Sequence, residues 1–425
     1  MLRFHSRRLC QCLNLMKNNL EIYIHIPFCV RKCRYCDFLS APADDETKEK
    51  YVKALINEIK AYGKILSKKQ LKVDSIFIGG GTPSVLEAGD MAEILSTVRN
   101  EFEFDSPEIT IEVNPKTVDQ DKLSSYRKSG INRLSIGLQS ANDSELTELG
   151  RIHTYEDFLD TYNWAMECGF ENINIDIMSA LPYQTKESYE KTVREIVRLM
   201  PKHISAYSLI VEDGTPLKEE VEKANRRGED ILPDEDTERE MYELTEQILK
   251  EAGYHRYEIS NYAVDKSHRC RHNVGYWQRK NYLGFGIGAA SLLGNLRYNN
   301  IDDVSDYIKI WSEYEKTDGY LNEETIEKAD GNVKIEELIS KTRTNILELS
   351  ENDEMEEFMF LGLRMMEGIS KEQFRESFGK DIEKVYGDVI DDLTNKKMIE
   401  EEDGFIRLTK RGIDVSNMVL SEFLL

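Results

Sequence analysis

The stretch that decides the fold is Tyr23-Ile-His-Ile-Pro-Phe-Cys-Val-Arg-Lys-Cys-Arg-Tyr-Cys-Asp-Phe38. The β-branched run at residues 21–26 predicts a strand, and Cys29, Cys33 and Cys36 follow it in a loop. Thiolates are soft ligands that suit iron–sulfur clusters or zinc. Structural zinc sites usually have four protein ligands, whereas three local thiols leave one position open. The loop therefore favours an iron–sulfur cluster with one free iron, and zinc is the alternative.

Outward from this loop, short β-branched runs alternate with amphipathic helical stretches as far as residue 263. The strand candidates are residues 21–26, 75–80, 108–113, 133–138, 172–178, 203–211 and 256–260. The helix candidates between them are residues 48–66, 91–102, 155–168, 189–200 and 236–251. This alternation predicts parallel strands joined by helices, and six or seven units favour a full or partial TIM-like α/β barrel. In such barrels the chemistry gathers at the C-terminal ends of the strands.

The chain divides by its pattern into four parts. Residues 1–20 are basic, with no acid, and are expected to be a leader or, preferably, a misassigned start upstream of Met16. Residues 21–263 are the predicted barrel. Residues 264–345 form a polar, aromatic and glycine-rich segment with a connection, and residues 346–425 predict a smaller, mainly helical C-terminal domain. The sequence of its tail predicts a helix, then a hairpin, then a second helix, which is the order found in a winged-helix module.

Composition and charge exclude several classes of protein. The seven cysteines are an odd number and too few for a disulfide framework. No run of about 18 apolar residues predicts a membrane-spanning helix, and with no secretory signal a cytoplasmic protein is expected. The net charge is −23, and residues 301–425 alone hold 16 basic and 32 acidic side chains. An acidic surface repels phosphate, so nucleic acid is not an expected partner and the tail is predicted to have a packing role.

The cysteine loop also resembles a known signature. The spacing CxxxCxxC, with an aromatic residue just before the third cysteine, resembles the radical S-adenosylmethionine (radical SAM) superfamily. The longer stretch YIHIPFCxxxCxYC is similar to its coproporphyrinogen III oxidase-like (HemN/HemW) branch. The resemblance implies that Cys29, Cys33 and Cys36 hold a 4Fe-4S cluster whose open iron binds the amino and carboxylate groups of SAM. It also implies that an electron from the cluster cleaves SAM to a 5′-deoxyadenosyl radical.

Residues at later strand ends fit the same resemblance. The turn Gly79-Gly80-Gly81-Thr82 follows the second strand candidate. Glycines let the backbone approach a ligand, and bare N–H groups can bind a charged partner, although a tight turn alone explains the motif. Polar residues at strand ends of barrels are usually site residues. By family position, the resemblance implies SAM contacts at Tyr23, Tyr35, Gly80, Gly81, Thr82, Glu112, Gln139, Arg151, Asp176 and Ala206.

A second informative stretch is Cys270-Arg-His-Asn-Val-Gly-Tyr-Trp277. An imidazole is a good axial ligand for haem iron, and tyrosine and tryptophan rings can pack against a flat macrocycle. The structural alternative is an aromatic cluster that docks the tail onto the barrel. The stretch resembles the HNxxYW motif of the haem chaperones in this branch, which implies haem contacts at His272, Asn273, Tyr276 and Trp277.

Two departures bear on the activity. The HemN-type oxidases carry a further cysteine just after the triplet, but here Asp37 and Phe38 follow Cys36. They also have a longer N-terminal extension before the first strand, whereas here 22 residues precede Tyr23. The resemblance therefore favours a haem chaperone, with a 4Fe-4S cluster, SAM and haem as cofactors, that delivers haem to a respiratory haem protein. The alternatives are an oxygen-independent coproporphyrinogen III oxidase and a zinc-binding structural protein. No catalytic residue is assigned, and peripheral membrane association and a homodimer are both compatible with the sequence.

Overall fold

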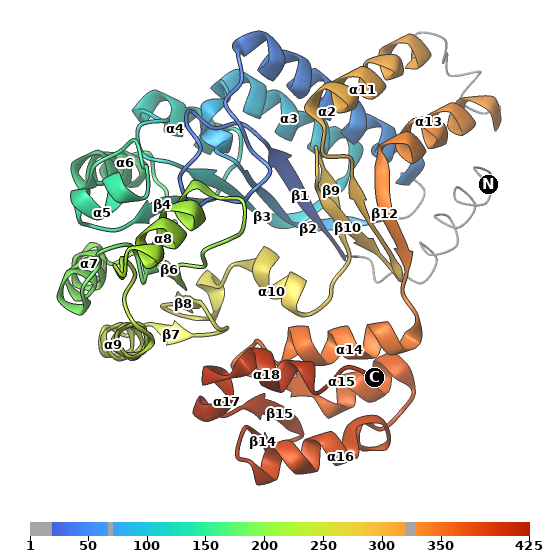
Figure 1. Cartoon of the computed structure of the whole chain (residues 1–425). Coiled ribbons are helices and arrows are strands. Elements are labelled where there is room, and N and C mark those ends of the chain that lie inside the picture. Colours follow the sequence, from blue (N-terminus) through green and yellow to red (C-terminus); the bar gives the residue numbers. More distant parts are fainter. Residues whose placement is uncertain (1–18, 67–70, 319–328) are drawn as a thin grey trace.

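The computed structural model describes residues 19–66, 71–318 and 329–425. Within these residues the main body is one large sheet with helices on its outer side, and a smaller domain lies beyond one end of the sheet (Figure 1). The expected leader or misassigned start, residues 1–20, lies outside the described residues except for Asn19 and Leu20, which begin the first strand.

The sheet has the strand order β12-β11-β10-β9-β1-β2-β3-β4-β5-β6-β8-β7. Its central strands from β9 to β6 are parallel, and the strands outside them are antiparallel. The sheet does not close, so the predicted α/β architecture is confirmed in its partial-barrel form. The strands are β1 (Asn19–Ile26), β2 (Lys72–Gly80), β3 (Glu103–Val113), β4 (Arg133–Gln139), β5 (Asn172–Ser179), β6 (His203–Ser208), β7 (His255–Arg256), β8 (Asn261–Ala263), β9 (Tyr282–Phe285), β10 (Ala290–Leu293), β11 (Leu296–Asn300) and β12 (Arg343–Glu348).

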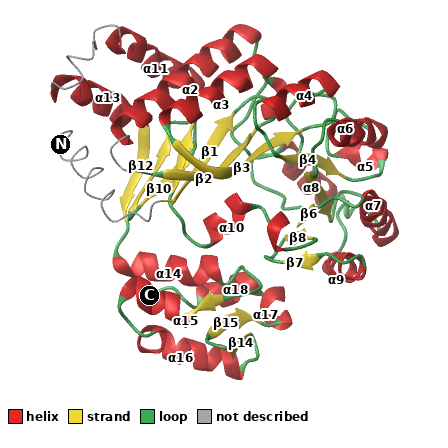
Figure 2. Cartoon of the chain, turned by 180° about the vertical axis from the view of Figure 1, so that it is seen from behind, coloured by secondary structure: helices red, strands yellow, loops and turns green. Residues whose placement is uncertain are grey.

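Helices follow most of the parallel strands and cover the outer face of the sheet (Figure 2). All five helices predicted from the sequence are present, and their apolar sides join the core of the sheet, as Ile59, Leu95 and Ile196 do. None of the described helices combines the length and the apolar character needed to cross a bilayer. The helices of this part are α2 (Asp45–Leu66), η3 (Pro83–Val85), α3 (Ala88–Glu101), α4 (Gln120–Lys128), α5 (Asp143–Glu148), α6 (Tyr155–Glu167), α7 (Lys186–Leu199), α8 (Pro216–Arg226), α9 (Glu235–Glu251), η4 (Lys266–His268), α10 (Arg271–Trp277), α11 (Val304–Asp318) and α13 (Ala329–Thr342).

The prediction of a seventh parallel strand at residues 256–260 is wrong. The chain turns back here, so that β7 and β8 form a short antiparallel pair. The carboxylate of Glu258 stabilises the turn because it accepts hydrogen bonds from the Ser260 N–H (2.8 Å) and the Asn261 side chain (2.6 Å). The parallel neighbour on the far side of β1 is instead β9, so residues 282–300 and 343–348 extend the same sheet.

The C-terminal domain has its own apolar core and its own sheet, of order β13-β15-β14. The helix, hairpin and helix predicted for the tail are present as α16, β14–β15 and α17. The methionine-rich stripe around residue 358 is helix core, since Met355 and Met359 are buried. The elements are α14 (Glu351–Gly362), β13 (Ile369–Ser370), α15 (Lys371–Phe378), α16 (Ile382–Asn395), β14 (Ile399–Glu402), β15 (Phe405–Leu408), α17 (Lys410–Asp414) and α18 (Ser416–Ser421).

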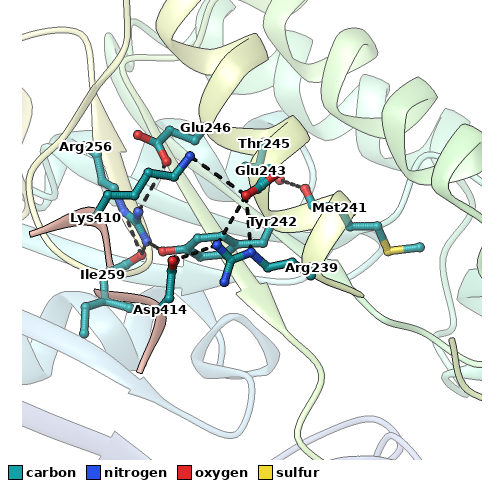
Figure 3. A network of polar contacts seen from close by, with 10 residues as sticks. All are labelled: Arg239, Met241, Tyr242, Glu243, Thr245, Glu246, Arg256, Ile259, Lys410 and Asp414. Atoms are coloured by element: carbon teal, nitrogen blue, oxygen red, sulfur yellow. Dashed lines mark hydrogen bonds and ion pairs between the residues drawn. The ribbon is translucent and has the colours of Figure 1, made fainter. Parts of the chain in front are cut away.

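Among the described residues, three sets of ion pairs dock this domain onto the main body. In one, Glu367 binds Lys266 (3.0 Å) and Arg269 (3.1 Å). Figure 3 shows another, in which Arg239 of α9 binds Asp414 of α17 (2.7 Å). In the third, Glu357 of α14 accepts hydrogen bonds from Arg279 (2.8 Å) and Arg297 (2.5 Å). Between the sheet and the domain lies the short helix α10 (Figures 1 and 2). The domain is therefore placed against the helix that carries the HNxxYW residues.

Candidate functional site

The three clustered cysteines lie on the loop between β1 and α2, at the carboxyl end of β1. Cys29, Cys33 and Cys36 are free thiols and partly exposed. Backbone hydrogen bonds shape the loop, from the Cys29 N–H to the Ala41 carbonyl (3.2 Å) and from the Cys36 N–H to the Cys33 carbonyl (3.3 Å). Burial raises the pKa of the Cys36 thiol. The loop thus presents three thiols at the end of the sheet where barrel chemistry is expected.

Two of these thiols accept hydrogen bonds from side chains on neighbouring loops, after β2 and after α5. The Thr82 hydroxyl donates to the Cys29 sulfur (3.5 Å), and the Arg151 guanidinium donates to the Cys33 sulfur (3.7 Å). Asn114 joins the two donors, because its amide N–H donates to Thr82 (2.7 Å) and its carbonyl oxygen accepts from Arg151 (2.5 Å). Hydrogen bonds to sulfur stabilise the thiolate form that binds metal.

Asn114 is a site residue that the sequence analysis missed. Its signal was its place directly after β3, two residues beyond Glu112, where the sequence reads Ile-Glu-Val-Asn-Pro. A cavity of about 20 Å³ beside Cys33 is lined by Thr82, Asn114 and Arg151 among others.

The thiols do not converge on a point. Among the described residues, no group of three His, Cys, Asp or Glu side chains is placed to hold a single metal ion. The thiolates of an iron–sulfur cluster bind different irons, so they need not converge as the ligands of one zinc ion do.

The turn after β2 is held by its own N–H groups. The Gly80 N–H donates to the Glu112 carboxylate (3.2 Å), the Gly81 N–H to the Ile26 carbonyl (2.9 Å) and the Thr82 N–H to the Phe28 carbonyl (2.7 Å). These three N–H groups are therefore used within the protein, as the tight-turn alternative implies. Glycine is required at position 80, where φ is +111° and a Cβ would lie 2.5 Å from the His25 ring.

His25 is buried, and both its ring nitrogens have protein partners. Its Nδ1 lies 3.0 Å from the Tyr23 hydroxyl, and its Nε2 lies 2.9 Å from the Leu39 carbonyl. Burial also lowers the pKa of His25. In this arrangement the imidazole positions Tyr23 and the cysteine loop, and it does not supply a fourth metal ligand.

Two carboxyl groups on neighbouring parts of the inner sheet face are close enough to repel. Burial and the charge of Asp176 raise the pKa of Glu112 to about 8. Burial also raises the pKa of Asp176, which accepts hydrogen bonds from Ser135 (3.1 Å) and Asn174 (2.8 Å). A cationic group bound between the two carboxyls would relieve this repulsion.

Three other residues predicted to contact SAM lie in different surroundings. Gln139 ends β4 with a φ of +74°, a conformation that costs free energy for a residue other than glycine. Ala206 of β6 pairs with Ile177 of β5. Tyr35 packs in the apolar cluster that contains Leu149. The structure therefore places Gln139 and Ala206 on strands β4 and β6, and Tyr35 on the cysteine loop.

A larger cavity, of about 270 Å³, lies between the sheet and α10. Its lining combines all four residues of the predicted haem motif with Tyr23, which the sequence analysis assigned to SAM. The other lining residues come from β2, β6, the β7–β8 turn and the end of α14. The full lining is Tyr23, Phe77, Tyr207, Glu258, Ser260, Asn261, His272, Asn273, Tyr276, Trp277 and Arg364.

His272 is held against the sheet from one side of its ring. Its Nδ1 lies 3.1 Å from the Ser75 hydroxyl and 3.9 Å from the Glu21 carboxyl, and its ring stacks on Phe77 with centroids 5.4 Å apart. Burial, together with the charge of Arg133, lowers the pKa of His272 to about 4. The imidazole is therefore neutral at pH 7, the form that binds a metal.

Beneath α10 lies a buried acid. Glu21 is 1% exposed, and neither of its carboxyl oxygens has a hydrogen-bond partner among the described residues. Burial raises its pKa to about 9. The helix approaches it closely at Gly275, where a Cβ would lie 1.7 Å from a Glu21 oxygen.

Comparisons with known proteins agree with this architecture. Residues 23–196 match the Radical SAM superfamily model, and residues 349–415 match the HemN C-terminal domain. The chain is 34% identical to the heme chaperone HemW of Lactococcus lactis subsp. lactis, over 97% of this chain and 98% of that protein. It is 33% identical to heme chaperone HemW of Bacillus subtilis, over 95% and 98% of the two chains. The solved structure of coproporphyrinogen III oxidase (HemN) from Escherichia coli aligns with a TM-score of 0.77, over 99% of this chain and 93% of that chain.

The fold and the cysteine loop define a protein of radical SAM type, as the sequence resemblance indicated. At 22% identity, the likeness to the coproporphyrinogen III oxidase structure shows a shared fold. Identity over nearly the whole length gives the narrower assignment: the chain belongs to the family of the HemW proteins within the radical SAM superfamily. Membership of this superfamily implies a 4Fe-4S cluster and SAM.

Proposed function

We propose that this protein binds haem and delivers it to a respiratory haem protein, on a scaffold that also binds a 4Fe-4S cluster and SAM. The observation that carries the proposal is the cavity beside α10, which gathers His272, Asn273, Tyr276 and Trp277 into one wall. The relatives from Lactococcus lactis and Bacillus subtilis, which match over nearly the whole chain, are named heme chaperones. A neutral imidazole beside aromatic rings is the chemistry that a haem iron and its macrocycle require.

The residues on this wall fit a tetrapyrrole in three respects. His272 uses Nδ1 within the protein, which leaves its other ring nitrogen for iron. The indole N–H of Trp277 is buried without a hydrogen-bond partner among the described residues. Tyr276 is 42% exposed and packs edge-on against Trp277, with ring centroids 5.1 Å apart. A flat aromatic ligand would cover these rings.

We propose that the cysteine loop holds the cluster. Cys29, Cys33 and Cys36 would be its ligands, and Thr82 and Arg151 would stabilise two of the thiolates through the hydrogen bonds they already make. A cluster with three protein ligands has one iron free to bind SAM. The buried carboxyls of Glu112 and Asp176, whose pKa values are raised mainly by burial, support the binding of a cationic group nearby. The proposed SAM contacts are Tyr23, Tyr35, Gly80, Gly81, Thr82, Glu112, Gln139, Arg151, Asp176 and Ala206.

We also propose that the divisions of the chain have functional meaning. The segment 21–263 would serve the cluster and SAM, the segment 264–345 would supply the haem wall, and residues 346–425 would support it from outside. The protein would work in the cytoplasm, and its contact with a membrane-bound haem acceptor would be peripheral.

A titration of haemin into the anaerobically prepared full chain tests the proposal. The wild type should bind about one haem, and His272→Ala should weaken binding at least about tenfold, because an axial ligand is lost. The exposed His255 on β7 gives the matched control, and His255→Ala should bind like the wild type. If neither the wild type nor the variants bind haem while the protein decarboxylates coproporphyrinogen III, the chain is an oxidase.

A further inference from the structure

One charged side chain in the large cavity has no role in the site described so far. Arg364 comes from the C-terminal domain, just after α14, and lines the same cavity as His272. Among the described lining residues it is the one guanidinium or ammonium group. Its Nε is buried without a hydrogen-bond partner in the described part of the chain. A buried donor left unpaired is costly, so its presence in a cavity points to an acceptor on a ligand.

The position of Arg364 is fixed by its neighbours. Its guanidinium lies over the ring of Trp277, 4.4 Å from the centroid. The next residue, Met365, is buried against Tyr257 and bridges to Glu258, and the Met366 N–H donates to the Tyr257 carbonyl (3.0 Å). Stacking on the indole occupies the face of the guanidinium and leaves the N–H groups at its edge free to point at a ligand.

The cavity also holds one acidic side chain, Glu258, but it does not satisfy Arg364. Its Oε1 accepts the hydrogen bonds of Ser260 and Asn261 that close the β7–β8 turn. No ion pair joins Glu258 to Arg364 among the contacts of the described residues. The guanidinium therefore remains available to an anionic group that enters with the ligand.

We propose that Arg364 binds a carboxylate of the tetrapyrrole whose iron meets His272, an inference that rests on the proposed function. Arginine binds carboxylates through paired N–H donors, and haem carries two propionate groups at one edge of the macrocycle. The C-terminal domain thus takes a direct part in ligand binding. Trp277 links the two contacts, since it stacks under Arg364 and belongs to the same helix as His272.

The test compares haemin with its dimethyl ester, in which both propionates are neutral and the iron is unchanged. Each is titrated into the full chain and followed by absorbance. The wild type should bind haemin about 10- to 100-fold more tightly than the ester, which is the range expected for a charge-assisted hydrogen bond. Arg364→Met should lose this preference by weakening haemin binding and leaving ester binding unchanged. Arg364→Lys, which keeps the charge without the paired donors, should retain part of it.

Arg269 provides the matched control. It lies over the Tyr257 ring and binds Glu367 of the C-terminal domain (3.1 Å), but it does not line the cavity. Arg269→Gln should therefore keep the preference for haemin. Equal losses for both ligands in Arg364→Met would show a purely structural role and overturn the inference. An unchanged preference in that variant would overturn it as well.

The carboxylate of SAM is the other possible source of the anion. If Arg364→Met weakened SAM binding and left the haemin preference intact, Arg364 would serve SAM and the inference would be wrong. If the wild type bound haemin and the ester equally, the inference alone would fail. If it bound neither, the proposed function would fail and the inference with it.

Discussion

At the scale of single residues, Asn114 connects the sheet to two of the three cysteines. Its side chain bonds Thr82 and Arg151, and these two residues donate to Cys29 and Cys33. The sequence predicted Thr82 and Arg151 through the family resemblance, but Asn114 belongs to no motif quoted there. Its role follows from the loops after β1, β2, β3 and α5 meeting in space, which linear spacing does not reveal.

We expect Asn114→Ala to weaken cluster binding while the chain stays folded. Residues that orient metal ligands typically contribute about 10- to 100-fold to metal affinity. The measurement is iron and sulfide per chain after anaerobic reconstitution and challenge with a chelator. Gln247→Ala, on α9 far along the chain, changes a side-chain amide bonded to Glu251 and should have no effect. Equal iron retention by the two variants would contradict the role given to Asn114.

The same scale shows what composition and spacing could and could not predict. The Cys29, Cys33 and Cys36 triplet predicted a loop site because thiols at these intervals have few other uses in such a chain. The glycine turn after β2 was recognised, but its N–H groups are used by Glu112, Ile26 and Phe28. Hydrogen-bond partners depend on which strands become neighbours, and that information lies outside the motif.

At the scale of elements, the strands and helices that carry strong periodicity were predicted well. The helices α2, α3, α6, α7 and α9 were all expected, because each presents an apolar stripe to the sheet. The short α10 was not, since seven residues carry no periodic signal. The β7–β8 turn was mistaken for a parallel strand because its alternation of side chains fits both forms.

Helix α2 contains a buried acid that should make stability depend on pH. Glu58 is fully buried and accepts hydrogen bonds from Gly286, Asn300 and Tyr307, but burial still raises its pKa to about 7. At pH values between 4.5, the ordinary pKa, and about 7, Glu58 keeps its proton in the folded chain but releases it in the unfolded chain. The contribution of Glu58 to the free energy of unfolding is therefore greatest below pH 4.5. It falls as the pH rises to 7, by at most about 1.4 kcal/mol per pH unit.

We expect Glu58→Gln to remove this fall, because glutamine stays uncharged. Urea unfolding at pH 5, 6, 7 and 8 should show the variant gaining stability relative to the wild type up to pH 7, with no further gain above it. Glu49→Gln, at an exposed position of the same helix, should follow the wild type. A constant difference between Glu58→Gln and the wild type at all four values would rule out this titration.

At the scale of the whole molecule, the sequence predicted a full or partial barrel followed by a helical domain, and a partial barrel and that domain are present. Why the sheet stays open could not be predicted, because it depends on the antiparallel strands at both edges: β10–β12 at one and the β7–β8 pair at the other. The docking of the C-terminal domain could not be predicted from the sequence either. It relies on ion pairs between residues far apart in the sequence, such as Glu357 with Arg279 and Arg297.

Two of the docking contacts, those of Glu357 and Asp414, should differ in strength. The Glu357 side chain is 6% exposed and bridges two arginines, so Glu357→Gln should lower the free energy of unfolding by about 2–3 kcal/mol. Asp414 pairs with Arg239, whose side chain is 43% exposed, and Asp414→Asn should cost less than about 1 kcal/mol. Thermal unfolding of both variants measures the difference. Equal shifts in the midpoint temperature of unfolding would mean that burial does not determine how strongly these ion pairs stabilise the chain.

The contact between Gly275 and Glu21 has a consequence for how the ligand wall can vary. A methyl group at position 275 would occupy the space of the Glu21 carboxyl, so either that carboxyl would have to turn aside or α10 would have to shift away from the sheet. A shift of the helix would carry all four side chains that it gives to the cavity. The shape of the chamber thus depends on a residue that contributes no atom to its surface, and variation there would alter ligand fit without changing any contacting side chain.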